Sequence, residues 1–151
     1  GMSAGYIQKS KKIVGHFIIE PHPEIIKYAI KLFTDNLQKG RMNLIQGFWE
    51  DILPYFEDEQ FDGILFDTNP LSQETLLFHF FHFFKDAHRL LKKGGVFTYF
   101  SDETKEISPG HLKLLQQAGF QDIEYKVCNI RPPKSCRYWT ANTIVVPIVH
   151  K

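Results

Sequence analysis

The polar run Asp67-Thr68-Asn69-Pro70 follows directly on the apolar stretch Phe61–Phe66. An apolar strand that ends in a carboxylate, with Pro70 stiffening the exit, places that carboxylate at the mouth of a ligand-binding cleft rather than in the core. The competing interpretation is an Asx-type turn that caps the following helix. Both can hold at once, and we take Asp67 as the first candidate for chemistry.

Two further polar clusters follow apolar strands. The stretch His16–Glu20 ends in an acid that can accept both hydroxyls of a ribose. The stretch Gly47–Asp51 places an aromatic ring that can stack on a purine beside a carboxylate that can accept from an exocyclic amine. Plain alternatives stay open: a solvent-facing Glu20, and a helix start with Trp49 in the core. Position favours ligand binding, because open α/β sheets bind ligands at the carboxyl ends of their strands.

Short β-rich runs alternate with longer helical patterns along the chain, which indicates βαβ units and an α/β fold with a mostly parallel sheet. The last two strands, joined by Pro132–Ser135, are expected to form an antiparallel pair at the sheet edge. The predicted strands are His16–Glu20, Met42–Ile45, Phe61–Asp67, Val96–Phe100, Ile123–Ile130 and roughly 138–149. The predicted helices run from about Pro21–Pro23 to Gly40, from Ser72 to Lys93 and from His111 to Ala118.

The start of the chain is unusual for such a fold. Gly1–Gly5 leads directly into a helical stretch, whereas a glycine-rich turn of this kind should follow the central first strand. Without that strand its two neighbours would flank a gap of about 4.8 Å with unpaired backbone groups. We therefore expect one domain over residues 1–151 whose first strand is missing. Either the chain is a fragment or a mis-started product, or something else, such as self-association, fills the gap.

The amino-acid composition argues against several classes of binding partner. Eighteen basic and 17 acidic residues nearly cancel and form no block of one sign, so neither nucleic acid nor an anionic membrane is an expected partner. The most apolar stretch, Leu76–Phe84, is interrupted by His79 and His82, and no membrane span or signal peptide is expected. Two cysteines build no disulfide framework, which favours the cytoplasm. No metal site is expected from the two histidines.

Seven segments spread over the chain carry a resemblance to a known family: Gly1-Met2, His16–Glu20, Gly47–Asp51, Phe61–Ser72, His88–Lys92, Gly94–Tyr99 and Pro132–Tyr138. Together they resemble guanidinoacetate N-methyltransferase, a class I Rossmann-like methyltransferase that uses S-adenosylmethionine. The resemblance runs nearly end to end, and it selects S-adenosylmethionine over NAD as cofactor.

The resemblance implies roles for individual residues. Asp67 would hold a guanidine and take its proton as the methyl group is transferred, leaving S-adenosylhomocysteine. A guanidinium nitrogen is a poor nucleophile until a carboxylate orients and deprotonates it. The residues implied in cofactor binding are Gly1, Met2 and Ser3 beneath the methionine part, Glu20, Pro21 and His22 at the ribose, Trp49 and Glu50 at the adenine, and Asp67.

Departures from the family concern the methyl acceptor. The family's aromatic residue after the Asp-Thr pair is Asn69 here, and Asp102 and Glu103 fall where the family binds the substrate carboxylate. Two acids there would repel guanidinoacetate unless their side chains point away. The family's N-terminal lid has no counterpart. The expected substrate-binding residues are Asp67, Thr68, Asn69, Asp102 and Glu103.

The expected function is N-methylation of a guanidino or amino group on a small molecule. An arginine methyltransferase acting on protein and a catalytically degenerate cofactor-binding or interaction module are the alternatives. A dinucleotide oxidoreductase would leave the segment at Asp67 without a role.

Overall fold

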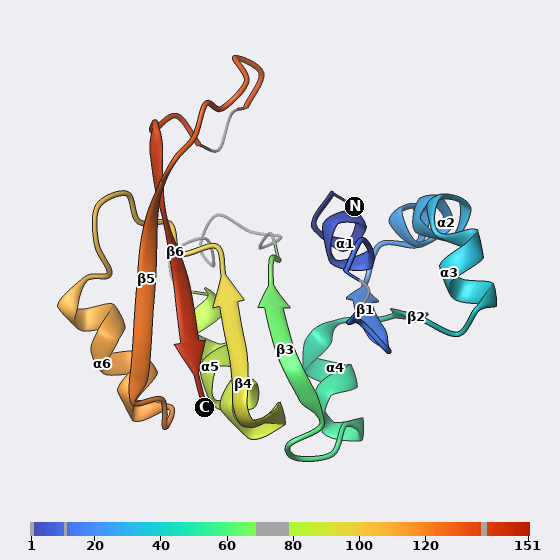
Figure 1. Cartoon of the computed structure of the whole chain (residues 1–151), viewed down its shortest axis with the longest axis horizontal. Helices are drawn as coiled ribbons and strands as arrows, with labels where there is room; N and C mark the ends of the chain where they lie inside the picture. The colour runs from blue at the N-terminus through green and yellow to red at the C-terminus, as the bar shows by residue number, and fades with distance from the viewer. Residues whose placement is uncertain (1, 11, 69–78, 137–138) are drawn as a thin grey trace. The chain divides into compact units, whose positions relative to one another are not determined.

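The computed structural model describes residues 2–10, 12–68, 79–136 and 139–151. The chain forms two compact units. The N-terminal unit comprises Gly1–Phe56 and the C-terminal unit Glu57–Lys151. Each unit holds one sheet, and both sheets contain parallel strands (Figure 1). The α/β fold is therefore confirmed, whereas a single domain over residues 1–151 stays a prediction.

The N-terminal unit is built on a two-stranded parallel sheet. Strands β1 and β2 pair in register from His16 opposite Met42 to Glu20 opposite Gln46. Both strands therefore end at the same edge of the sheet. The elements of this unit are α1 (Met2–Gln8), β1 (His16–Glu20), α2 (Pro23–Leu32), α3 (Thr34–Gln38), β2 (Met42–Gln46), α4 (Trp49–Ile52) and a 3₁₀ turn, η1 (Leu53–Tyr55).

Helix α2 begins where the sequence predicts but ends earlier. Pro23 occupies the first turn, where its missing N–H costs nothing, and the His22 side chain accepts a hydrogen bond from the backbone N–H of Glu24. Phe33, with φ −114° and ψ 22°, interrupts the helical conformation, so that α3 forms a separate helix. Gly40, with φ +67°, follows α3 and ends the helical region in a left-handed conformation that glycine adopts easily.

The N-terminal residues form a helix rather than a turn. Met2–Gln8 is helical, and Gly5 lies inside this helix. The predicted glycine-rich turn at residues 1–5 is therefore wrong for the described residues. Local propensity explains the difference, because Met, Ala and Gln are good helix formers that outweigh one glycine.

The C-terminal unit has a four-stranded sheet of order β3-β4-β6-β5 (Figure 1). Strands β3 and β4 are parallel, β6 is antiparallel to β4, and β5 is antiparallel to β6. The predicted antiparallel pair at the sheet edge is confirmed. The elements are β3 (Phe61–Phe66), α5 (His79–Leu90), β4 (Leu91–Tyr99), α6 (Pro109–Gln117), β5 (Asp122–Asn129) and β6 (Thr143–His150).

The end of α5 and the start of β4 differ from the prediction. Helix α5 ends at Leu90 instead of Lys93, because the fully buried Leu91 already pairs with Phe61 of β3. The glycines that were expected to end the helix lie within β4 instead. A Cβ atom on Gly95 would lie 2.9 Å from the carbonyl oxygen of Lys92, so this close approach requires glycine.

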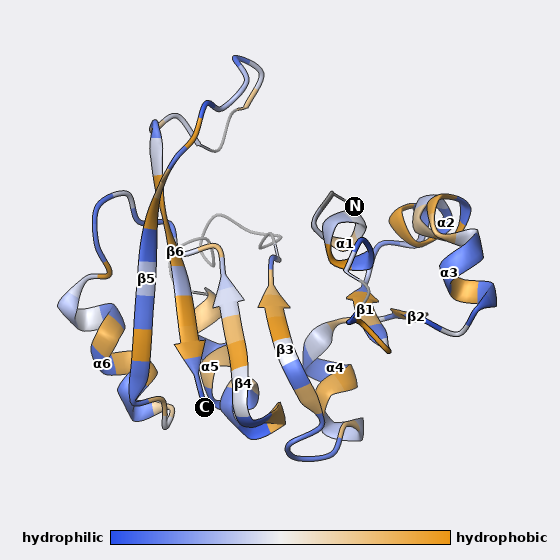
Figure 2. Ribbon diagram, in the orientation of Figure 1, coloured by the Kyte–Doolittle hydropathy of each residue, from blue (hydrophilic) through white to orange (hydrophobic). Residues whose placement is uncertain are grey.

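The core of the C-terminal unit is aromatic. Phe97 and Tyr99 lie two residues apart, and so on one face of β4, with ring centroids 4.8 Å apart. Phe84 of α5 packs against both, and Phe120 stacks on Phe97. Figure 2 shows β6 as hydrophobic over most of its length, whereas β5 carries many hydrophilic residues. Strand β6 is therefore an inner strand and β5 an edge strand.

Candidate functional site

Glu20 is the last residue of β1, as predicted, and its side chain is half-buried. Its Oε1 atom accepts a hydrogen bond of 2.8 Å from the backbone N–H of His22. The imidazole of His22 then caps α2 through Nδ1, 3.2 Å from the N atom of Glu24. The turn Glu20–His22 therefore holds a carboxylate at the strand end in a defined orientation, and its second oxygen, Oε2, can accept a ligand hydroxyl.

The segment after β2 lies at the same edge. The backbone N–H of Gly47 donates to the carbonyl oxygen of Glu20 over 3.2 Å, which ties the two strand ends together. Trp49 and Glu50 then open α4, with Trp49 half-buried and Glu50 exposed. The structure thus brings Glu20, Trp49 and Glu50 to one edge of the two-stranded sheet. Ser3 lies in α1, and Gly1 is outside the described residues.

Asp67 follows the last residue of β3 in the C-terminal unit, and both Asp67 and Thr68 are exposed. Phe66 pairs with Tyr99 of the parallel strand β4, so the two strands end level with each other. The segment after Tyr99 therefore starts beside Asp67 at one edge of the sheet. Asn69 lies outside the described residues.

Asp102 and Glu103 point in different directions in the segment after β4. Asp102 is exposed, with a left-handed φ of +58° that is uncommon for a residue other than glycine. The Glu103 side chain is only 20% exposed, and its Oε1 atom accepts a hydrogen bond from the N–H of Ser108. Glu103 therefore faces the protein interior, and its carboxylate is engaged there. The predicted repulsion of an acceptor carboxylate by both acids applies at most to Asp102.

His111 and Tyr99, which the sequence analysis did not select, complete a buried polar cluster with Glu103. The Tyr99 hydroxyl and His111 Nε2 are 2.5 Å apart, and each residue is 3% exposed. Burial lowers the pKa of His111 and raises that of the Tyr99 hydroxyl. His111 is thus neutral near pH 7. The sequence signal was a histidine in the first turn of a helix, one turn before Leu114 and Leu115.

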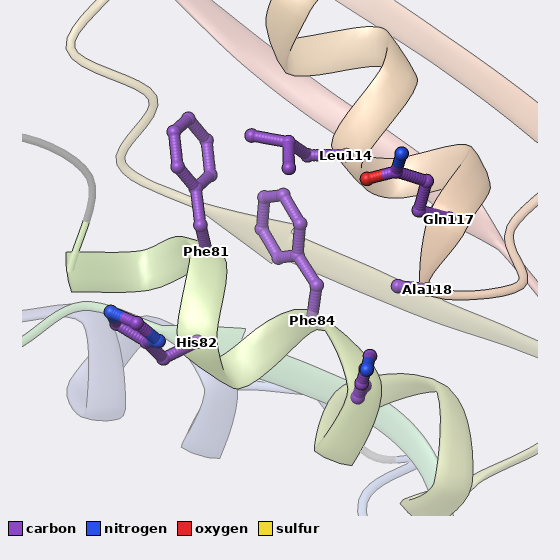
Figure 3. Close-up of a pocket in the computed structure, with 7 residues that line it drawn as sticks. Phe81, His82, Phe84, Leu114, Gln117 and Ala118 are labelled. Carbon is purple, nitrogen blue, oxygen red and sulfur yellow. The ribbon is translucent and has the colours of Figure 1, made fainter.

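A groove of about 200 Å³ lies between α5 and α6 of the C-terminal unit. Figure 3 shows Phe81 and Phe84 of α5 facing Leu114 of α6 across it. Of the predicted site residues that the structure describes, none lines this groove. His82 does, but no group of three or more His, Cys, Asp or Glu in the described ranges could hold a metal ion. Across the same ranges, no helix is long and apolar enough to cross a membrane.

Parallel strands with acids at their carboxyl ends are typical of Rossmann-like folds, and the solved structures that share this fold with the chain include methyltransferases. A family model for guanidinoacetate N-methyltransferase matches residues 1–151. The chain belongs to the guanidinoacetate N-methyltransferase family, whose cofactor is S-adenosylmethionine. The resemblance inferred from the sequence is confirmed.

Several known proteins are similar to this chain. Protein arginine N-methyltransferase 2 of Yarrowia lipolytica is 25% identical over 98% of this chain and 34% of its own length. A spermidine synthase from Thermotoga maritima matches with a TM-score of 0.68 at 15% identity, over 98% of this chain and 49% of that one. An S-adenosylmethionine-dependent O-methyltransferase from Thermotoga maritima matches with a TM-score of 0.61 at 16% identity, over 98% and 54%.

At these low identities the two solved structures show the fold alone. The chain spans about a third to a half of the length of these three proteins.

Proposed function

We propose that the protein transfers a methyl group from S-adenosylmethionine to a guanidino or amino nitrogen of a small molecule. The observation that carries this is the position of Asp67, an exposed carboxylate at the carboxyl end of β3. The loop after the neighbouring strand β4 starts beside it. Membership of the guanidinoacetate N-methyltransferase family supports the choice of a nitrogen acceptor.

The residues of the N-terminal unit fit the cofactor. Glu20 is a half-buried carboxylate fixed by its own turn, which suits a pair of ribose hydroxyls. Trp49 offers an aromatic surface, and the exposed Glu50 can accept from the amine of the adenine. When bound, S-adenosylmethionine supplies an electrophilic methyl group.

Asp67 would act on the acceptor. A guanidinium or ammonium group is cationic in water, and a carboxylate binds it by charge-assisted hydrogen bonds. The nitrogen loses a proton when it is methylated, and Asp67 accepts that proton as a general base. The same contact fixes the direction of the nitrogen, which lowers the entropic part of the barrier.

The inward orientation of the Glu103 side chain affects which methyl acceptors the site can bind. Because its carboxylate contacts His111 and Ser108, it does not exclude an acceptor that carries its own carboxylate. Its neighbour Asp102 is exposed and disfavours such an acceptor. Guanidinoacetate therefore stays a candidate beside guanidines that carry a second amine, such as agmatine.

A protein substrate is the second candidate, and one observation favours it. The fungal relative that matches 98% of this chain is described as a protein arginine N-methyltransferase. An arginine side chain presents the same guanidinium to Asp67 as a small guanidine does.

The test is transfer of a labelled methyl group from S-adenosylmethionine to guanidinoacetate, agmatine or an arginine-containing peptide. We expect transfer to at least one of these guanidines. Absence of transfer to all three would contradict the proposal, and transfer to the peptide alone would select the protein substrate.

Glu20→Gln should weaken binding of S-adenosylhomocysteine by about 10-fold or more, because a neutral amide makes a weaker hydrogen bond to a hydroxyl than a carboxylate does. The glutamine keeps an oxygen for the N–H of His22, so the turn should be preserved. Calorimetric titration measures the change. Glu24→Gln, an exposed acid four residues away that pairs with Lys27, is the matched control. Equal affinity of both variants would remove Glu20 from the cofactor site.

Asp102→Asn should lower the KM for guanidinoacetate by about threefold or more, because it removes a like charge near the acceptor carboxylate. The KM for agmatine, which lacks a carboxylate, should stay equal or rise. Initial-rate measurements with both acceptors check this. An unchanged ratio of the two KM values would show that Asp102 does not face the acceptor.

A further inference from the structure

Four hydrogen bonds around Glu103 hold the chain after β4 in place. Its backbone N–H donates to Ser101 Oγ over 3.3 Å, and its carbonyl oxygen accepts from the N–H of Val145 over 2.8 Å. Its Oε1 atom accepts from the N–H of Ser108 over 2.9 Å. Ser101 Oγ in turn donates to the carbonyl oxygen of Val145 over 2.7 Å. Glu103 therefore joins the loop to β6 and to the start of α6.

The second carboxylate oxygen of Glu103 points at His111. Nδ1 of His111 lies 3.3 Å from Oε2, at ion-pair distance, and this buried oxygen accepts no hydrogen bond from the described residues. A buried carboxylate oxygen needs a donor, so Nδ1 carries the imidazole proton. Nε2 then accepts from the Tyr99 hydroxyl, 2.5 Å away. Tyr99 therefore donates to His111, and His111 donates toward the carboxylate of Glu103.

The surroundings of His111 fix this order. Phe80, Phe81 and Phe84 of α5 pack around the imidazole, with ring centroids between 5.0 and 5.7 Å away. Burial lowers the pKa of His111, and the charge of Glu103 opposes that effect only in part. Burial together with the same charge raises the pKa of the Tyr99 hydroxyl. The cluster is therefore a neutral Tyr–His pair that ends on one carboxylate.

We propose that Glu103 and His111 are positioning residues for the methyl acceptor. They fix the backbone of residues 101–103 at the carboxyl end of β4, level with Asp67 at the end of β3. Neither side chain contacts the acceptor. This inference rests on the proposed function and replaces the expectation that Glu103 binds the acceptor directly.

The decisive variant is Glu103→Gln. A glutamine has one acceptor oxygen, so it cannot accept from both Ser108 N–H and His111 Nδ1–H, and one anchor of the loop is lost. The KM for the acceptor that the wild-type chain methylates should rise about 10-fold, the equivalent of one charge-assisted hydrogen bond. The kcat and the affinity for S-adenosylhomocysteine should change by less than about threefold, since neither depends on this anchor.

Ser101→Ala provides a second variant without a change of charge. It removes the hydroxyl that bridges Glu103 and Val145, and it should raise the same KM by a smaller factor. Glu106→Gln is the matched control, because Glu106 is an exposed acid of the same loop, and it should behave as wild type. Circular dichroism gives the folded fraction of each variant.

The acceptors for the assay are guanidinoacetate, agmatine and an arginine-containing peptide. A raised KM with retained kcat and cofactor affinity supports the proposal. If kcat falls in proportion to the folded fraction while KM is unchanged, Glu103 has a purely structural role, and the proposal is overturned. Weaker binding of S-adenosylhomocysteine at unchanged KM also overturns it. Methylation of no acceptor by the wild-type chain overturns the proposed function, and this inference with it.

Discussion

Asp67→Asn is expected to lower the rate of methyl transfer by about 100-fold or more, as loss of a general base does. The amide keeps the size of the side chain and can still accept a hydrogen bond from the acceptor. It neither attracts the cation nor takes its proton. Asp67 is exposed beyond the last residue of β3, so the variant should fold normally. Affinity for S-adenosylhomocysteine should be nearly unchanged.

The matched control for this variant is Asp62→Asn on the same strand. Asp62 is an exposed acid that pairs with Lys92 over 2.9 Å, and such surface pairs contribute little to stability. The Asp62→Asn variant should retain the wild-type rate of methyl transfer. Equal rates for the two variants would remove Asp67 from the mechanism.

Phe97→Ala is expected to reduce the free energy of unfolding by about 3–5 kcal/mol, the range for deletion of a buried aromatic ring. Phe97 is fully buried in β4. Its ring contacts Phe83, Phe84, Tyr99 and Phe120. Urea unfolding followed by circular dichroism measures the loss.

Tyr125→Ala provides the comparison for that loss. Tyr125 is also an aromatic residue on a strand, but it lies on the edge strand β5 and is 42% exposed. Its removal should cost less than about 1 kcal/mol, as is usual for surface substitutions. Similar costs for the two variants would contradict the position of Phe97 at the centre of the core.

Most strands could be predicted from the sequence because each is a short apolar run between turn residues. His16–Glu20 is correct at both ends, and the predicted Phe61–Asp67 is one residue longer than β3. Helix ends were harder to place. The helical pattern continues beyond Leu90, but pairing of Leu91 with Phe61 overrides it. Phe33 interrupts the helix predicted to end at Gly40, without a proline or glycine to signal it.

The sequence located the acids of the site but not their directions. Asp67 and Glu20 end strands, and the end of a strand is visible as a change from apolar to polar residues. Glu103 stands beside Asp102 in the sequence, yet one turns inward and the other outward. That difference depends on His111 and Val145, which are distant in sequence, so no local pattern encodes it.

Calorimetric titration of the chain with S-adenosylhomocysteine tests the central claim most directly. If Glu20, Trp49 and Glu50 hold the cofactor, a single binding site is expected, and Glu20→Gln should weaken it by about 10-fold or more. NAD should produce no comparable heat. Absence of detectable binding of S-adenosylhomocysteine at millimolar concentration would contradict the claim.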